Sequence, residues 1–385
     1  MIGLEDTGLR GVKAATSRIS LVDGKAGKLL YRGYAIEDLA RESNYEEVCY
    51  LLLHQRLPRS AQLRSFSREL ASERSLPSDL LELLRGLPPS TPPMAVIQAG
   101  VALLAADCPD TGDDSIEANR RKASRIIAKL PTMVAAWKRI RVGQEIVEPR
   151  PSLSHAANFL YMIRGEEQDA SMARFMDVAL ILHADHGFNA STFTARAVAS
   201  TRASMYAAVS AGIAALSGTL HGGANAQVMK NLLEIDDPDN VEEWVDKQFH
   251  LGRRVSGMGH AVYRTIDPRA AILRDLARTV LMGRRECRWY EMTERMVKAT
   301  QEQFRLRKGR EIYPNIDMYS ASLYHSLGIH HDFYPAVFAM ARSAGWAAHV
   351  LEEKFPRPPV KPVLYRPSCL YLGEYNREYI PIMER

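Results

Sequence analysis

Cysteine is scarce in this chain of 385 residues, and its four copies are widely scattered. Cys49, Cys108, Cys287 and Cys369 form no paired spacing, which argues against a structural zinc site and against a disulfide framework. This pattern is typical of a reducing compartment. We therefore expect a cytoplasmic protein.

Long apolar runs and a strong excess of charge are also missing. The most apolar long stretch, residues 333–351, is interrupted by Arg342 and His349, so it does not predict a membrane-spanning helix. Met1 to Arg10 lack the apolar core of a signal peptide. A formal net charge of +5 is small for this length, so we expect no nucleic-acid partner, although an anionic substrate would suit it.

The composition is that of a soluble globular protein with a sizeable core, at 46% hydrophobic and 25% charged residues. Apolar residues recur at spacings of three and four along most of the chain, which predicts helices such as 123–140 after a charged segment at 107–121. Between Arg18 and Tyr34, two short β-like runs around Asp23-Gly24 predict a hairpin. The sequence thus predicts an all-α fold with one small N-terminal hairpin.

His221 sits on a two-glycine break, Ser217-Gly-Thr-Leu-His-Gly-Gly-Ala-Asn225, between predicted helices at 205–216 and 224–235. Glycine permits both a positive φ and a close approach to a ligand. The helix that restarts after the break would direct free N–H groups toward a ligand there. Two interpretations stay open: a catalytic histidine at a helix start, or a capped corner with an incidental histidine.

His183 and His186 lie three residues apart at the end of an apolar helix, in LILHADHGFNAST. Such a pair shares one helical face and could bind a metal ion. No third ligand follows at a matching spacing, so we predict no metal site. The alternative is that one histidine packs in the core while the other faces a site.

A second glycine break, GMGH at 257–260, carries His260, but no βαβ unit surrounds it to make a dinucleotide site. Asp267-Pro268 predicts a helix start, with Asp as the N-cap. Arg269 then falls in the first helical turn, where a cation opposes the helix dipole. It either meets an anion or is solvated.

Asp317 has apolar neighbours, and burial would raise its pKa into the range of a general base. The alternative is a helix N-cap. Arg342 lies within an apolar helix, so it needs an anionic partner from elsewhere in the fold or from a ligand. Arg366 follows in a proline-limited loop. Several arginines suit a dicarboxylate, and a carboxylate with neutral imidazoles suits proton abstraction beside a carbonyl.

Seven motifs, in this order, carry a resemblance: DGKAGKLLYRGYAIEDL, LHADHGFNAST, LHGGAN, GMGHAVYRTIDPRA, YPNIDMYS, FAMARSAGW and YRPSCLYLG. Together they resemble citrate synthases over nearly the whole chain. The resemblance implies an all-α homodimer with the active site in a cleft between two domains. The large domain would comprise residues 1–222 and 324–385, and the small inserted domain residues 223–323.

The resemblance also implies roles for individual residues. His221 would donate a hydrogen bond to the thioester carbonyl of acetyl-CoA, and Asp317 would remove the methyl proton. His260 would polarise the ketone of oxaloacetate. His186 would bind oxaloacetate, which leaves His183 to packing.

By the same resemblance, Arg269, Arg342 and Arg366 would hold the carboxylates of oxaloacetate, the last of them across the dimer. Acetyl-CoA would be a co-substrate, and we expect no tightly bound cofactor. The expected coenzyme A contacts are Gly257, Met258, Gly259 and Asn315, with Arg253, Arg254 and Arg264 as candidates for its phosphates.

Two departures and two rivals bear on this interpretation. Position 261 is Ala, where many bacterial relatives have Arg and 2-methylcitrate synthases often have Pro, which favours citrate over 2-methylcitrate made from propionyl-CoA. The chain lacks the long N-terminal extension of hexameric forms, which favours a simple dimer without NADH inhibition. A non-catalytic helical binding protein would lack His221, His260 or Asp317, and all three are present.

Overall fold

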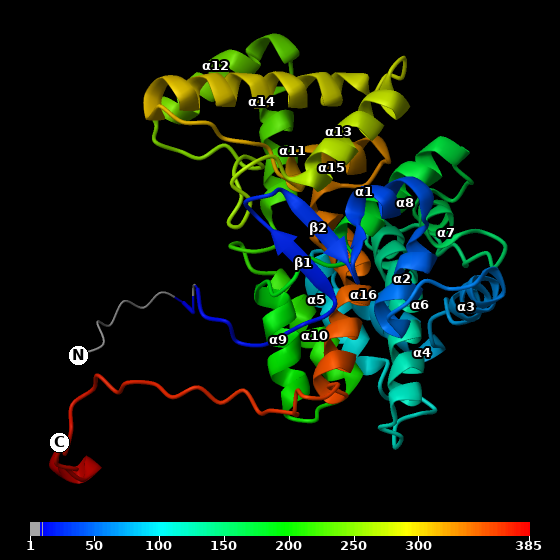
Figure 1. Ribbon diagram of the computed structural model, residues 1–385, viewed down its shortest axis with the longest axis vertical. Helices are drawn as coiled ribbons and strands as arrows, with labels where there is room; N and C mark the ends of the chain where they lie inside the picture. Colours follow the sequence, from blue (N-terminus) through cyan, green and yellow to red (C-terminus); the bar gives the residue numbers. More distant parts are fainter. Residues whose placement is uncertain (1–7, 10) are drawn as a thin grey trace.

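The computed structural model describes residues 8–9 and 11–385, and this part of the chain is mostly helical (Figure 1). It contains sixteen α-helices and one small three-stranded sheet. The predicted all-α fold is therefore confirmed. The segment Met1 to Arg10, for which the sequence predicts no signal peptide, falls mostly outside the described residues.

The first ten helices cover residues up to the His221 break. They are α1 (Ile36–Glu42), α2 (Tyr45–His54), α3 (Ser60–Ser72), α4 (Ser78–Gly86), α5 (Pro93–Leu103), α6 (Ile116–Ile140), α7 (His155–Arg164), α8 (Ala170–His183), α9 (Ala190–Ser200) and α10 (Met205–Leu216). Helix α6 starts earlier than the predicted 123–140, because Ser115 caps it by accepting a hydrogen bond from the Ala118 N–H.

The remaining helices follow the break. They are α11 (Ala224–Ile235), α12 (Val241–His250), α13 (Pro268–Leu281), α14 (Cys287–Lys308), α15 (Ile316–Ser326) and α16 (Tyr334–Lys354), with short 3₁₀ turns η1 (Pro238–Asn240), η2 (His331–Phe333) and η3 (Ile382–Glu384). Helices α10 and α11 have the predicted bounds.

Helix α16 is the central element of the fold and runs through the middle of the molecule (Figure 1). Nearly all its residues are buried, and it packs against α9, α6, α10, α2 and α8. Its many alanines are small and allow neighbouring helices to pack closely on every side. A helix that is mostly apolar all round is typical of a protein core. Arg342 and His349 lie on this helix and are therefore buried with it.

Helices α11 to α15 form a second group at the top of Figure 1. Within this group α12 packs on α14, and α11, α13 and α14 all pack on α15. Helix α13 also contacts α8 and α1 of the first group. The group corresponds closely to the span expected for the small domain, whose boundaries stay a prediction.

The sheet consists of β1 (Ser20–Asp23), β2 (Lys28–Tyr31) and β3 (Tyr34–Ala35), antiparallel and in that order. Asp23 pairs with Lys28, so the loop of the hairpin has four residues, 24–27, instead of a tight turn at Asp23-Gly24. Asp23 Oδ1 accepts hydrogen bonds from the N–H groups of Lys25 and Ala26, which shapes this wider loop. The predicted hairpin is confirmed, with a longer turn and a third short strand.

The hairpin loop supports a distant part of the chain. A Cβ atom on Gly24 would stand 2.2 Å from the carbonyl oxygen of Val262, so only glycine fits there. The backbone N–H of Arg264 donates to the carbonyl oxygen of Gly24 at 2.8 Å. The loop that follows His260 thus rests on the N-terminal hairpin.

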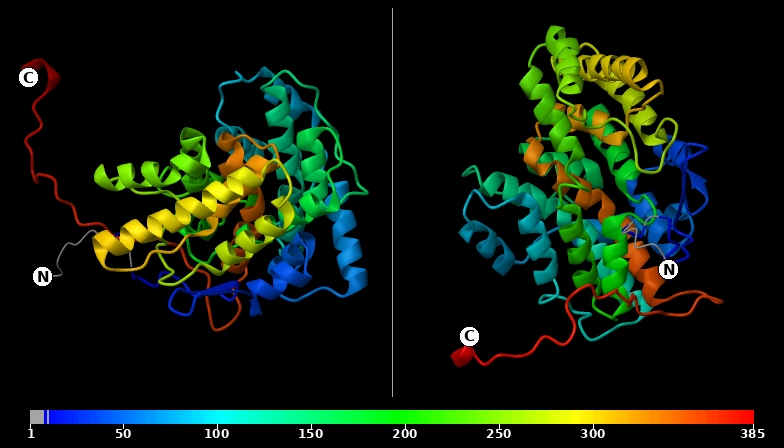
Figure 2. Two further views of the ribbon diagram at one scale, coloured as in Figure 1. Left: turned by 90° about the horizontal axis from the view of Figure 1, so that it is seen from above. Right: turned by 90° about the vertical axis from the view of Figure 1, so that its left-hand side faces the viewer.

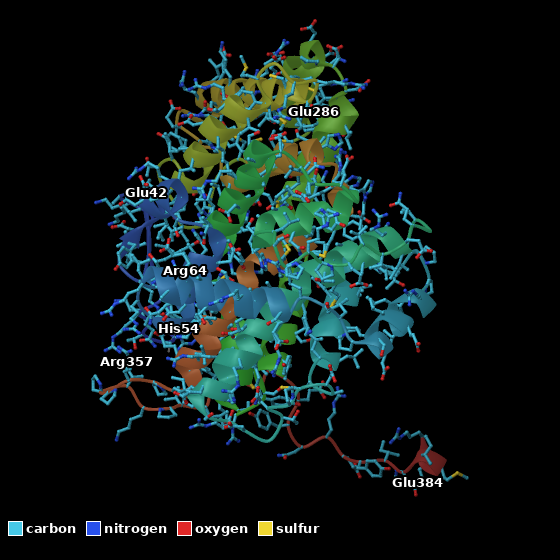
Figure 3. All side chains as sticks on the ribbon, turned by 90° about the vertical axis from the view of Figure 1, so that its right-hand side faces the viewer. Glu42, His54, Arg64, Glu286, Arg357 and Glu384 are labelled. Carbon is cyan, nitrogen blue, oxygen red and sulfur yellow. The ribbon has the colours of Figure 1, made fainter. Side chains whose placement is uncertain are left out.

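After α16 the chain continues as a long extended segment, residues 355–385, which we call the tail and which leaves the body after Tyr365 (Figures 1 and 2). Figure 3 shows its end, near Glu384, far from the helices. Every residue from Arg366 onward is exposed. Several of these are large and apolar: Leu370, Tyr371, Leu372, Tyr375, Tyr379, Ile380, Ile382 and Met383.

Two further predictions concern cysteines and membranes. Across the described residues all four cysteines are free thiols, with Cys49 and Cys108 buried. In the same part of the chain, every helix is too short or too polar to cross a lipid bilayer.

Candidate active site

The glycines of the His221 break serve close packing. A Cβ atom on Gly222 would stand 2.2 Å from the carbonyl oxygen of Leu216, so the chain passes there without a side chain. Neither Gly222 nor Gly223 has a positive φ, which corrects the idea that they turn the chain. Gly223 is the N-cap of α11, with no side-chain cap. His221 therefore does not cap the helix that follows it.

The imidazole of His221 is held instead by the first turn of α9. The backbone N–H of Ser191 donates to Nε2 at 3.2 Å, and Ser191 Oγ lies 2.8 Å from the same nitrogen. A ring nitrogen that accepts an amide proton carries none itself, so we infer a neutral ring with its proton on Nδ1. Burial, and then the charge of Arg342, lower the pKa of His221 to about 4. The Nδ1–H group is left to serve a ligand.

His260 is oriented in the opposite sense. Its Nδ1 accepts from the backbone N–H groups of Val262 at 2.9 Å and Tyr263 at 3.1 Å, so the proton lies on Nε2. Burial, and then the charge of Arg269, lower the pKa of His260 to about 4. Both histidines are therefore neutral hydrogen-bond donors near pH 7.

The loop before His260 is tied to the segment before α15. Gly259 N–H donates to the carbonyl oxygen of Tyr313 at 2.8 Å, and Asn315 N–H donates to that of Gly257 at 2.9 Å, around an isolated bridge between Met258 and Pro314. Gly257 and Gly259 both have φ of +81°, which other residues rarely adopt. This pairing brings His260 and the start of α15 together.

Asp317 lies in the first turn of α15 without capping it. The N-cap is Asn315, whose Oδ1 accepts from the Asp317 N–H at 2.9 Å, and whose Nδ2 donates to the carbonyl oxygen of Gly259 at 2.7 Å. Among the described residues, no hydrogen bond reaches the Asp317 carboxylate. Burial raises the pKa of Asp317 to about 6, although Arg269 and Arg342 oppose the shift. These are the properties of a general base.

Arg269 meets its anion within its own helix turn. Its Nε and Nη2 donate to the two carboxylate oxygens of Asp267 at 3.0 and 2.8 Å, and both side chains are almost fully buried. Asp267 also caps α13 by accepting from the Arg269 N–H. Burial alone would lower the pKa of Arg269, but Asp267 raises it overall. Arg269 Nη1 takes no part in this pair.

Arg342 is less fully paired. Its Nε donates to the carbonyl oxygen of His183 at 2.7 Å, and its guanidinium carbon lies 4.7 Å from the centre of the Phe338 ring. In the described part of the chain no carboxylate comes within 4.0 Å of it. Burial lowers the pKa of Arg342 to about 10. A buried cation without a carboxylate partner is suited to bind an anionic ligand.

His186 stands beside His260, with 5.3 Å between the ring centres, and its Nε2 lies 3.3 Å from Tyr263 Oη. Burial and the charge of Arg269 hold the pKa of His186 well below its usual value. His183 is fully buried, and its Nδ1 bonds to the carbonyl oxygen of Ala179. Of the two histidines, only His186 faces the site.

Of the seven residues expected to act in catalysis or to bind oxaloacetate, six therefore gather in one place. They are His186, His221, His260, Arg269, Asp317 and Arg342. The charge of Arg342 acts to lower the pKa of both His221 and Asp317, so both residues lie within its electrostatic field. Arg366 lies outside the group, exposed on the tail. Arg253 and Arg254 are exposed before the Gly257 loop.

A cavity of about 320 Å³ lies beside His260. It is lined by Gly259, Arg264, Arg310 and Tyr313 among others. Arg264 thus lies where an anionic group of a bound ligand could meet it. Met258 and Asn315 instead hold the backbone in the bridge described above.

Sequence reasoning missed the contacts that three residues make in the site. Ser191 fixes the tautomer of His221, Tyr263 contacts both His186 and His260, and Asp267 holds Arg269. Only Asp267 carried a sequence signal, as an N-cap two residues before an arginine. Throughout the described residues, no three His, Cys, Asp or Glu side chains are grouped to hold a metal ion.

The raised pKa of Asp317 predicts the pH dependence of any reaction in which this carboxylate acts as the base. A base must be ionised, so kcat/KM should be constant above about pH 7 and fall about tenfold per pH unit below the Asp317 pKa of about 6. His221 and His260 remain neutral over this range. A pH–rate profile between pH 4.5 and 9 measures this limb. No fall in kcat/KM down to pH 4.5 would contradict the raised pKa of Asp317.

The chain is similar to known proteins over nearly its whole length. It matches the family model "Citrate synthase, C-terminal domain" over residues 8–368. It is 45% identical to the citrate synthase of Haloferax volcanii, with 100% of both chains covered. It is 39% identical to 2-methylcitrate synthase 1 of Corynebacterium glutamicum, with 98% of each covered.

Solved structures agree with these relatives. The fold matches the citrate synthase of Thermoplasma acidophilum, solved as a ternary complex with carboxymethyl coenzyme A and oxaloacetate. The TM-score is 0.90 at 33% identity, with 98% of both chains covered. With 98% of this chain covered, the match extends over nearly all of the helices and loops described above. The chain therefore belongs to the citrate synthase family.

Proposed function

We propose that this chain condenses acetyl-CoA with oxaloacetate and water to give citrate and coenzyme A. The observation that carries the proposal is one arrangement: a carboxylate of raised pKa, two neutral histidines with oppositely assigned protons, and two buried arginines. Proton abstraction beside a carbonyl needs a base and a donor for the developing oxyanion. The arginines suit a dicarboxylate acceptor.

In the first step Asp317 removes a proton from the methyl group of acetyl-CoA. The Nδ1–H of His221 donates to the thioester oxygen as negative charge develops there, giving an enol or enolate. A neutral imidazole suits this step, since the first-turn N–H of α9 prevents protonation of Nε2 and so keeps Nδ1–H as the only donor.

In the second step the enolate carbon attacks the ketone carbon of oxaloacetate. His260 Nε2–H donates to the ketone oxygen, which becomes the hydroxyl of citryl-CoA. Water then cleaves the thioester and releases citrate and coenzyme A. Arg342 and the free Nη1 of Arg269 would hold the carboxylates of oxaloacetate, with His186 beside them.

We further propose a homodimer in which Arg366 completes the site of the partner subunit. Support comes from the tail, whose exposed apolar side chains are typical of a surface covered by another chain. Arg366 is exposed directly after Tyr365, where the tail leaves the body, and is therefore able to reach a second copy. The free thiols of the described cysteines suit the cytoplasm.

Coenzyme A would lie along the cavity beside His260. Arg264 and Arg310 on its wall would meet the phosphates. Arg253 and Arg254 are weaker candidates, because they are exposed and line no part of this cavity.

The choice of acyl group is testable with purified protein. We expect free thiol release from acetyl-CoA only when oxaloacetate is present, and kcat/KM larger for acetyl-CoA than for propionyl-CoA. One extra methylene is worth only about 1–3 kcal/mol, so the preference should be about 10- to 200-fold. The reverse preference would make 2-methylcitrate the product, and no release with either thioester would refute the condensation.

A further inference from the structure

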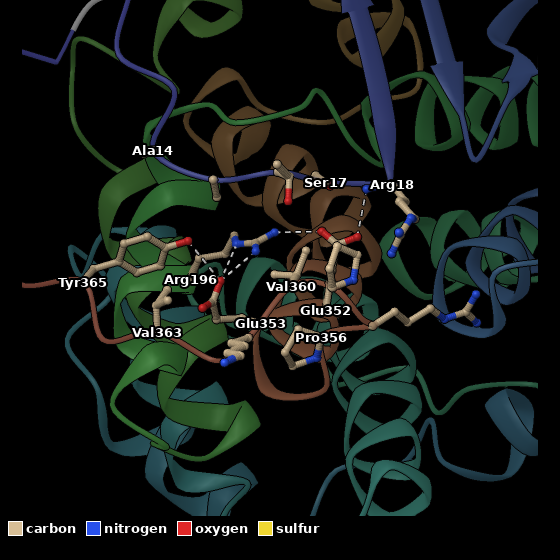
Figure 4. Close-up of a pocket in the computed structure, with 15 residues that line it drawn as sticks. Ala14, Ser17, Arg18, Arg196, Glu352, Glu353, Pro356, Val360, Val363 and Tyr365 are labelled. Atoms are coloured by element: carbon tan, nitrogen blue, oxygen red, sulfur yellow. Dashed lines mark hydrogen bonds and ion pairs between the residues drawn. The ribbon is translucent and has the colours of Figure 1, made fainter.

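A buried group of charged side chains begins at Arg196 of α9. Its guanidinium donates to Glu353 through Nε at 2.9 Å and Nη2 at 2.7 Å, and to Glu352 through Nη1 at 2.8 Å (Figure 4). Arg196 and Glu353 are about 5% exposed or less. Burying such ions costs free energy unless each is paired and fixed, so this group defines a rigid geometry.

On one side, this group anchors the tail. Tyr365 Oη donates to Glu353 Oε2 at 3.1 Å (Figure 4). The Tyr365 N–H donates to Ser200 Oγ at 3.2 Å. The ring stands edge-on to Phe193, with 5.9 Å between centres. Every later residue is exposed, so Tyr365 is the last one held by the body. Its neighbour is Arg366.

On the other side, the group reaches the loop that carries His186. Arg196 Nη1 lies 3.3 Å from His349 Nδ1, and because arginine only donates, that nitrogen accepts and the proton lies on Nε2. His349 Nε2 lies 3.3 Å from Asp185 Oδ1, which is an electrostatic contact, although neither atom meets the geometry of a hydrogen bond. Both of these residues are fully buried.

Asp185 shapes the substrate side of this loop. Its Oδ2 accepts from the Gly187 N–H at 3.0 Å and from Ser20 Oγ, and its carbonyl oxygen accepts from Tyr31 Oη at 2.8 Å. Burial alone would raise the pKa of Asp185, but His349 and Arg342 lower it. A shift of Asp185 would move the adjoining His186.

We propose that Arg196 is a positioning residue. Through its contacts it connects the loop that carries His186 in its own active site, which we call the oxaloacetate loop, to the anchored Tyr365. In a dimer, one network then sets His186 in one active site and Arg366 in the other. The inference rests on the proposed function, in which Arg366 completes the partner's site. Glu353 is the residue to test, because it contacts both Arg196 and Tyr365.

The experiment uses dimers with a single working site, made by co-expressing two differently tagged subunits. One subunit carries Asp317→Asn and supplies Arg366, and the other carries Arg366→Ala and supplies the base. Activity of the mixed dimer well above that of either parent tests the crossing of Arg366. A mixed dimer no more active than its parents would count against the proposal that Arg366 completes the partner's site. That outcome is distinct from the effect of Glu353→Gln on KM, which tests the network.

Glu353→Gln is then placed in the subunit that supplies Arg366, or in the subunit that supplies the base. We expect a three- to tenfold rise in KM for oxaloacetate in both positions, with kcat nearly unchanged, because one hydrogen bond to a charged group is weakened. Tyr365→Phe, which keeps every buried charge, should raise KM in both positions too. Tyr161→Phe, at a tyrosine of α7 far from the tail, is the matched control and should change nothing.

An unchanged KM in both positions would overturn the proposal. The proposal would also be overturned if KM for oxaloacetate rose only when Glu353→Gln was in the subunit that supplies Arg366. The network would then anchor the tail without reaching the oxaloacetate loop. If Glu353→Gln subunits fail to assemble, KM for oxaloacetate in the Tyr365→Phe dimers provides the same test.

Discussion

Asp317→Asn should lower kcat by about 10²- to 10⁴-fold, the usual contribution of a general base, and should raise thermal stability at pH 7–8. The amide keeps the shape of the side chain but cannot accept the methyl proton. Steady-state kinetics and thermal unfolding of the same samples measure both effects. Oxaloacetate binding, followed by calorimetry, should remain measurable.

The gain in stability follows from the direction of the pKa shift. The pKa of Asp317 is raised from 3.8 to about 6 by burial, so its neutral form is the one that the fold favours. That favourable contribution is complete below about pH 4 and is lost as pH rises through 6. Above pH 7 the ionised carboxylate costs up to about 3 kcal/mol, which the asparagine avoids.

Asp239→Asn is the matched control for this substitution. Asp239 is 89% exposed and pairs with Arg295 on the surface, so kcat and stability should both stay within error of the parent. Wild-type turnover in the Asp317 variant would refute its role as the base. A large loss of stability would show that the carboxylate is structural.

His221→Ala should lower kcat by about 10²- to 10³-fold, because the donor to the thioester oxygen is lost. KM for oxaloacetate should change little, since the arginines and His260 remain. The variant should also lose stability, by about 1–3 kcal/mol, because the Ser191 N–H is left without its acceptor. Kinetics and denaturant unfolding measure the two losses.

His221→Gln separates the two roles of the ring. The glutamine oxygen can accept from Ser191 where Nε2 did, but its NH₂ group then lies away from the position of Nδ1, so the donor to the thioester oxygen is missing there. Stability should therefore recover while kcat stays low. His250→Ala, at an exposed histidine of α12, is the control and should match the parent. Recovery of kcat in the glutamine variant would contradict the assigned tautomer.

The sequence predicted the helical fold and the composition of the candidate site well, for identifiable reasons. Helix bounds such as 205–216 and 224–235 agree because glycine and serine mark the ends of regular apolar spacing. Asp267 was correctly expected to cap α13. The interpretation of Asp317 as a cap was excluded only by the structure, in which Asn315 caps α15.

What the sequence could not provide are contacts between distant segments. Ser191 lies in α9 and His221 in the break between α10 and α11, and no local pattern indicates that the Ser191 N–H orients the His221 ring. The partner of Arg269 was two residues away, yet spacing alone cannot distinguish an internal pair from a ligand. Gly222 was expected to turn the chain, but it is needed because Leu216 passes too close for a Cβ atom.

The contact between the hairpin loop and the segment after His260 joins residues about 240 positions apart in the chain. Contacts of such long range carry a high cost in chain entropy and form only when most of the fold is in place. The orientation of His260 depends on the segment that Gly24 supports. Catalytic competence is therefore a property of the completed fold, and helical structure can be regained during refolding before activity is.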